Sequence, residues 1–171
     1  MSASLDPFTA ACDDGLEMAP APPIPPHLTT VTPRLVVSDG AAAIDFYVAA
    51  FGAEPVGERH TMPDGALIHA ELRIGNAIVM LTQDSGDGAP AAAPAPGRAV
   101  NVILATYWED VDGAWQRALA AGAEVIYPLA DQFYGERGGR LRDPYGHQWM
   151  LSRVTEVLSA DEIARRGAAQ S

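Results

Sequence analysis

Residues 36–54 read VVSDGAAAIDFYVAAFGAE, and residues 107–124 read YWEDVDGAWQRALAAGAE. In both stretches apolar side chains recur at the i, i+3 and i+4 spacing of a helix with one buried face. Before each apolar pattern an aspartate, Asp39 or Asp110, can accept a hydrogen bond from the first helical turn. After each pattern a glycine, Gly52 or Gly122, suits the left-handed conformation that ends a helix. Each half of the chain is therefore predicted to contain a strand, a capped helix and a glycine stop.

The two stretches belong to an internal repeat. Gly52 and Gly122 are 70 residues apart, and segment 78–81 corresponds to segment 148–151 at the same offset. Turn residues divide the rest of the first half into three antiparallel strands, expected over 55–62, 66–74 and 77–82. In the second half we expect strands over 124–129, 140–142 and 147–153, with a long loop over 130–139. The predicted fold class is α+β, with two βαβββ modules.

Proline and glycine mark the boundaries of these modules. Residues 1–28 are predicted to form an extended arm, because five prolines between positions 20 and 26 lack the backbone donor that helices and sheets need. Segment 84–98, rich in Ala, Pro and Gly, is a predicted linker between a first module, 29–83, and a second module, 99–153. The tail, 154–171, is predicted to hold a short helix capped by Ser159. Residues 29–171 are expected to form one domain.

The composition excludes several partners. Acidic residues outnumber basic residues by 22 to 11, and the net charge of −11 opposes binding to nucleic acid or to an anionic membrane surface. No apolar run reaches the length of a membrane span. The single Cys12 excludes an intrachain disulfide, and the first residues lack the pattern of a secretory signal. We therefore expect a cytoplasmic protein.

The second copy of the module ends in Arg-Asp-Pro-Tyr-Gly-His, residues 142–147, just before its closing strand. A duplicated βαβββ unit with this turn resembles the vicinal oxygen chelate superfamily, which includes glyoxalases, bleomycin resistance proteins and dioxygenases. Further segments carry the resemblance to a glyoxalase-like subgroup: 31–37, 46–47, 51–53, 69–72, 80–81 and 135–149. The resemblance implies that the modules curl into an incomplete barrel, with helices on the convex faces and a ligand or metal in the concavity.

In the predicted strand over 69–74, apolar and polar side chains alternate, which predicts the face that each residue occupies. Ala70, Leu72 and Ile74 fall on one face, and His69, Glu71 and Arg73 fall on the other. Because the apolar face must meet the helix, His69, Glu71 and Arg73 are expected to face the concavity.

The resemblance also implies where a metal would be held, on the first and last strand of each module. Carried onto this sequence, those positions are Thr32, Met80, Ile103 and Met150. None is a suitable ligand for a hard divalent metal, because Ile has no donor atom, Met offers a soft thioether and a Thr hydroxyl is weak. We therefore expect no cofactor. A divalent metal held by a non-standard set that includes His69 and Glu71 is the alternative.

Without the metal, the concavity still combines apolar side chains with a few polar ones, as ligand sites do. The candidate catalytic residues are Glu71 and His69. The candidate ligand-binding residues are Thr32, Arg34, Arg73, Met80, Tyr107, Phe133, Tyr134, Arg137, Gln148 and Met150. Three of these come from the predicted loop, whose glycines and aromatics would suit a mobile lid or an ordinary surface loop.

Two functions follow. The first is a metal-independent protein that binds an amphipathic or aromatic metabolite, like the drug-sequestering members of the superfamily. The second is a lyase or isomerase in which Glu71 acts as general base and His69 or an arginine polarises a carbonyl group. The pair of His69 and Glu71 is also consistent with a purely structural hydrogen bond. We favour binding.

Two modules need another pair to complete a concave sheet. The linker over 84–97 is long enough to allow this pairing within one chain or with a second copy. We expect a homodimer, with exchanged modules as one arrangement.

Overall fold

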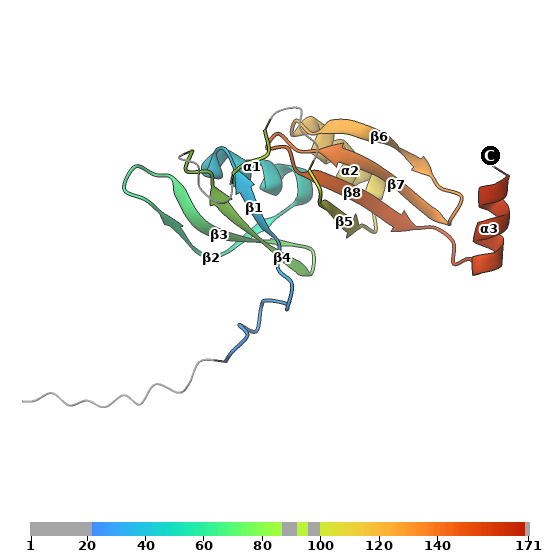
Figure 1. Cartoon of the computed structure of the whole chain (residues 1–171), viewed down its shortest axis with the longest axis horizontal. Coiled ribbons are helices and arrows are strands. Elements are labelled where there is room, and N and C mark those ends of the chain that lie inside the picture. Colours follow the sequence, from blue (N-terminus) through green and yellow to red (C-terminus); the bar gives the residue numbers. More distant parts are fainter. Residues whose placement is uncertain (1–21, 87–91, 96–99, 170–171) are drawn as a thin grey trace, which may run out of the picture.

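The structure is a computed structural model that describes residues 22–86, 92–95 and 100–169. Each module forms one four-stranded sheet with one helix (Figure 1). The first contains β1 (Arg34–Val37), α1 (Gly40–Phe51), β2 (Glu54–Thr61), β3 (Leu67–Ile74) and β4 (Ala77–Gln83). The second contains β5 (Ile103–Tyr107), α2 (Val111–Ala120), β6 (Glu124–Asp131), β7 (Glu136–Arg142) and β8 (Gln148–Val154). A third helix, α3 (Ala160–Ala168), follows. The predicted α+β fold with two βαβββ modules is confirmed.

The two sheets have the same strand order. In the first it is β1-β4-β3-β2, and in the second it is β5-β8-β7-β6. In each sheet the first strand runs parallel to the last, and the other neighbours are antiparallel. In each module the helix connects the first strand, at one edge of the sheet, to the second strand, at the other edge, and covers one face of the sheet, which leaves the opposite face open.

The predicted helix caps are present. The side chain of Asp39 accepts a hydrogen bond from the amide of Ala42, and that of Asp110 accepts one from the amide of Gly113. Gly52 ends α1 with a φ of 62°, in the left-handed region that favours glycine. Ser159 caps α3 and accepts a hydrogen bond from the amide of Glu162, as predicted.

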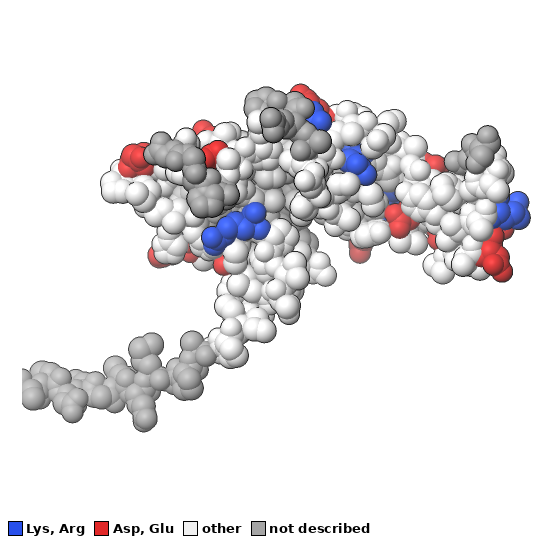
Figure 2. Space-filling view, in the orientation of Figure 1, with Lys and Arg blue, Asp and Glu red and all other residues white. Residues whose placement is uncertain are grey.

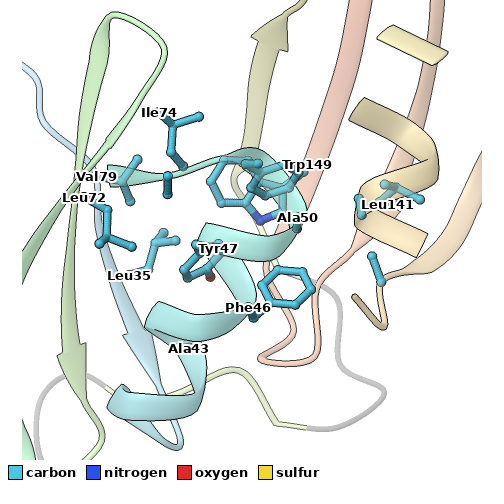
Figure 3. Packing of buried hydrophobic residues seen from close by; sticks show 14 of the residues in the cluster. Leu35, Ala43, Phe46, Tyr47, Ala50, Leu72, Ile74, Val79, Leu141 and Trp149 are labelled. Atoms are coloured by element: carbon cyan, nitrogen blue, oxygen red, sulfur yellow. The ribbon is translucent and has the colours of Figure 1, made fainter. Parts of the chain in front are cut away.

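One hydrophobic core joins the two modules. Leu35, Leu72 and Val79 of the first sheet pack against α1, and Trp149 and Leu141 of the second sheet belong to the same cluster. Figure 3 shows α1 between these two groups of side chains. The modules also meet directly through α1 and α2, which lie next to each other (Figure 1). Burial of aromatic side chains along α1 therefore fixes the second module against the first.

A buried carboxylate adds a specific contact between the modules. Asp143, in the turn before β8, is only 3% exposed. It accepts hydrogen bonds from the Tyr47 hydroxyl at 2.7 Å and from the Trp149 indole at 2.9 Å. Its other oxygen accepts bonds from the amides of Tyr145 and His147. Burial, the Asp143 charge and the hydrogen bond to that carboxylate raise the pKa of Tyr47 well above its ordinary value.

The predicted long loop over 130–139 is wrong. The chain continues as β6 to Asp131, turns over 132–135 and returns as β7 from Glu136. Gly135 has a φ of 87° and makes the turn. Gly139 lies within β7, where a Cβ would come within 2.7 Å of the Trp115 ring, so only glycine fits at this position. Close packing, rather than flexibility, therefore explains this glycine.

The C-terminal helix α3 stands apart from the two sheets (Figure 1). Its acidic and basic residues lie side by side at that end of the molecule (Figure 2). Arg166 forms ion pairs with Glu156 and Glu162, and Arg165 pairs with Glu162. Of the helices described, none is both long and apolar enough to cross a membrane. Most of the predicted arm, over 1–21, and parts of the predicted linker lie outside the described residues.

Candidate functional site

The open face of the first sheet carries a polar cluster around Glu71. Ala70, Leu72 and Ile74 are buried on the helix side of β3, so the predicted alternation places His69, Glu71 and Arg73 on the opposite face, and the structure shows this. Met80 lies directly opposite Glu71 on β4, and Arg34 lies opposite Met80 on β1. The predicted residues Arg34, His69, Glu71 and Met80 therefore share one face.

Glu71 contacts two imidazoles. His27, from the segment before β1, places its Nε2 2.8 Å from one carboxylate oxygen of Glu71. His69 places its Nε2 3.4 Å from the other oxygen. Arg34 lies 3.1 Å from Nδ1 of His69, and because an arginine only donates, this contact leaves the His69 proton on Nε2, toward Glu71. The side chain of Glu71 is consequently only 14% exposed.

His27 was not predicted as a site residue, because a histidine among prolines has no periodic signal. The described part of the arm nevertheless returns to the open face of the first sheet. His60, on the neighbouring strand β2, lies opposite His69, and the two rings stack with centroids 6.2 Å apart. A register irregularity between Val56 and His60 precedes this pair.

The open face of the second sheet carries three further predicted residues, Tyr107, Gln148 and Met150. Met150 on β8 lies opposite Ala105 on β5 and Arg140 on β7. Gln148 and Tyr107 lie on the same face, one row to either side. The Tyr107 hydroxyl donates a hydrogen bond of 3.1 Å to Glu136, which raises the pKa of Tyr107.

A hollow of about 230 Å³ lies on this second face. Two of the candidate ligand-binding residues, Met150 and Tyr134, line it. Its other lining residues were not predicted: Tyr127, Gln132, Gly138, Gly139, Arg140 and Ser152. The signal for Arg140 was present, because alternation around a buried Leu141 puts residues 140 and 142 on the open face. The wrong loop over 130–139 hid Gln132, Gly138 and Gly139, whereas Tyr127 and Ser152 lie in strands that were predicted.

Two of the three residues predicted in the loop, Arg137 and Phe133, do not line this hollow. Arg137 is on β7 but turns toward the start of α2, where it forms hydrogen bonds with Asp112 and an ion pair with Asp131. Phe133, at the tip of the hairpin, packs near Gly167 of α3. These positions of Arg137 and Phe133 follow because a hairpin takes the place of the predicted loop. Thr32 precedes β1, and its hydroxyl donates to the Thr29 carbonyl in a local turn.

A second hollow, of about 380 Å³, lies between the modules. It is lined by the edge strand β1, including Arg34, and by Gln148 of β8. His147, at this boundary, bonds through Nε2 to the Val36 carbonyl at 2.9 Å. The His147 side chain therefore contributes a contact between the two modules.

The donor set does not fit the metal implied by the superfamily. Thr32, Met80, Ile103 and Met150 offer one bound hydroxyl and two thioethers, which are poor ligands for a hard divalent cation. Near Glu71, the Arg34 guanidinium lies beside His69 and would repel a cation. Among the described residues, no group of three or more His, Cys, Asp or Glu side chains is arranged to hold a metal ion.

Comparison with known proteins identifies the family. The model of the Glyoxalase/Bleomycin resistance protein/Dioxygenase superfamily matches residues 25–151. The chain belongs to this superfamily. A protein of Mycobacterium bovis, described as uncharacterized, is 44% identical over 135 residues, which cover 78% of this chain and 88% of that protein. A similarly described protein of Mycobacterium tuberculosis is 44% identical over 135 residues, covering 78% of this chain and 79% of that protein.

Solved structures share the fold. TioX from Micromonospora sp. ML1 superposes with a TM-score of 0.58 at 29% identity, covering 74% of this chain and 98% of TioX. The fosfomycin resistance protein FosX from Mesorhizobium loti superposes with a TM-score of 0.55 at 17% identity, covering 82% of this chain and 97% of FosX. The likeness to FosX concerns the fold alone.

Proposed function

We propose that this chain is a metal-independent small-molecule-binding protein that holds an amphipathic or aromatic metabolite against its open sheet faces. The observation that carries the proposal is the hollow on the second sheet, where Tyr127, Tyr134 and Met150 surround a few polar groups. Tyrosines supply flat contact surfaces, and methionine adapts to irregular ligands. This mixture of aromatic, apolar and sparse polar groups is typical of ligand sites.

The proposal includes a second copy of the chain. Each sheet leaves one face open, and Ile103, Tyr107 and Tyr127 of the second sheet are 41%, 60% and 60% exposed. A partner's first sheet placed over this face would cover these side chains and enclose the hollow. Light scattering during size-exclusion chromatography should give twice the mass of one chain. A monomer at micromolar concentration would contradict the shared cavity.

The alternative function is a lyase or isomerase with Glu71 as general base. What favours it is the half-buried carboxylate flanked by the imidazoles of His27 and His69. Both imidazoles already contact Glu71, however, and the arm residue His27 lies 2.8 Å from its carboxylate. A substrate would have to displace the arm before it reached the base, so the arrangement supports binding better than proton transfer.

Native mass spectrometry of the full chain, purified from its own host together with metal analysis, tests the proposal. We expect a small-molecule adduct without stoichiometric metal. Stoichiometric zinc, nickel, iron or manganese, held by side chains of the open faces, would overturn metal independence. The cytoplasmic location stays a prediction from the sequence.

A further inference from the structure

Four arginines among the described residues are half-buried: Arg137, Arg140, Arg142 and Arg166. Arg140 differs from the other three in its contacts. Three of them have a carboxylate within 4.0 Å: Asp112 for Arg137, Glu124 for Arg142 and Glu156 for Arg166. Arg140 has no such partner among the described residues, and no hydrogen bond from its side chain to a described residue is formed.

The position of Arg140 directs its charge into the hollow of the second sheet. Its Cζ lies 5.1 Å from the centroid of the Tyr127 ring, within cation–π range. Its Nε is buried and has no hydrogen-bond partner among the described residues, and the residue lines the hollow with Tyr134 and Met150. A half-buried cation without a counter-ion is costly, because it loses hydration and gains no ion pair in return.

The acidic side chains of β6 and β7 already have partners, and Asp131 is paired with Arg137. Glu124, on the neighbouring strand β6, forms the 3.5 Å ion pair with Arg142. Glu136, at the start of β7, accepts the hydrogen bond from the Tyr107 hydroxyl. The protein carries a net charge of −11, yet the charge that this hollow presents through Arg140 is positive. The short-range field, which decides how a ligand docks, is therefore opposite in sign to the net charge.

We infer that the hollow binds a flat organic anion, with its acid group paired to Arg140 and its planar body against Tyr127 or Tyr134. This inference rests on the proposed function and names the ligand class for that site. A guanidinium matches carboxylate, sulfonate and phosphate oxygens through two parallel hydrogen bonds, and each such bond is stronger than one between neutral groups. Gln132 and Ser152 line the same hollow and can bond polar substituents of the ligand.

The test compares an acid with its neutral amide on the full chain. We would titrate 2-naphthoate and 2-naphthamide by isothermal calorimetry into the wild type, Arg140→Gln and Arg153→Gln. Arg153 is an exposed arginine of β8 and serves as the matched control. The expected result is that the wild type and Arg153→Gln prefer the acid by about tenfold or more, and that Arg140→Gln loses this preference while it still binds the amide. A melting curve checks that each variant is folded.

The outcomes separate the inference from the proposed function. If the wild type binds the amide as tightly as the acid, or if Arg140→Gln keeps the preference, the hollow still binds planar molecules but the anion inference is wrong. If neither probe binds the wild type, both the inference and a ligand site in this hollow are contradicted. A parallel titration with 2-naphthalenesulfonate and 2-naphthyl phosphate distinguishes the acid groups, since a site that selects carboxylate binds neither as tightly as 2-naphthoate.

Discussion

The Tyr47 hydroxyl donates a 2.7 Å hydrogen bond to Asp143, and the two residues belong to different modules. Asp143 also accepts hydrogen bonds from the Trp149 indole and from two backbone amides of the second module. Tyr47 is therefore its one hydrogen-bond donor from the first module among the described residues. The bond therefore connects α1 to the turn that precedes the closing strand of the repeat. Both residues are buried, which makes the bond costly to remove.

We expect Tyr47→Phe to lower the free energy of unfolding by about 1–3 kcal/mol, because it removes one donor from a buried carboxylate. Urea unfolding followed by circular dichroism measures the change. Tyr107→Phe is the matched control, since the Tyr107 hydroxyl also donates to a carboxylate but lies at the exposed surface. Its effect should stay within about 0.5 kcal/mol. Equal effects of the two substitutions would mean that Tyr47 is not a link between the modules.

The pKa of Tyr47 predicts how stability changes at alkaline pH. Burial and the Asp143 charge hold this pKa well above the ordinary value of 10.0, and burial raises the pKa of Tyr145 to about 12. Above pH 10.0 an unfolded tyrosine releases its proton while the folded Tyr47 keeps it. The contribution of Tyr47 is therefore complete below pH 10.0 and is lost as the pH rises toward its folded pKa. Urea unfolding at several alkaline pH values should show a shallower decline for Tyr47→Phe than for the wild type; parallel declines would contradict the assignment.

The hairpin over β6 and β7 is predicted to be rigid rather than lid-like. Substitution of Gly139 by Ala would place a Cβ 2.7 Å from the Trp115 ring and 2.8 Å from the Leu129 amide. Overpacking of this kind costs about 1–3 kcal/mol, and thermal unfolding should report it as a lower melting temperature. A variant as stable as the wild type would show that the hairpin moves freely away from α2.

Most of the fold could be predicted from the repeat. Gly52 and Gly122 at a common offset, with the aspartates that cap both helices, predicted the modules and nearly all their strands. The hairpin was missed because Gly138 and Gly139 in sequence look like loop residues, whereas in space they make room for Ser152 and Trp115. Only tertiary packing distinguishes these two uses of glycine.

Some residues of the candidate site could be predicted from local sequence patterns, and others depend on tertiary contacts. Strand alternation correctly placed His69, Glu71 and Met80 on one face, because period-two burial is a local property. The contact of His27 with Glu71 spans 44 residues and has no local signal. Arg140 lay in the predicted strand 140–142, but that strand actually begins at Glu136, so the pairing of Arg140 with Tyr127 across the hairpin was not expected.

Replacement of Glu71 by Gln distinguishes binding from catalysis. If the protein only binds, a ligand that co-purifies with it should be recovered unchanged after incubation with the wild type. Glu71→Gln should then change the affinity at most. Glu58→Gln, on the exposed strand β2, is the control. Product formation by the wild type that falls by about 100-fold in Glu71→Gln, with affinity preserved, would establish Glu71 as a general base instead.

A calorimetric comparison shows whether ligand binding by this protein depends on a metal ion. The ligand released from the purified protein is titrated into chelator-treated protein, and again after addition of one equivalent of zinc, nickel or manganese. We expect the same dissociation constant in every titration and no conversion of the ligand. Binding or turnover that appears only after a divalent metal is added would contradict metal-independent binding.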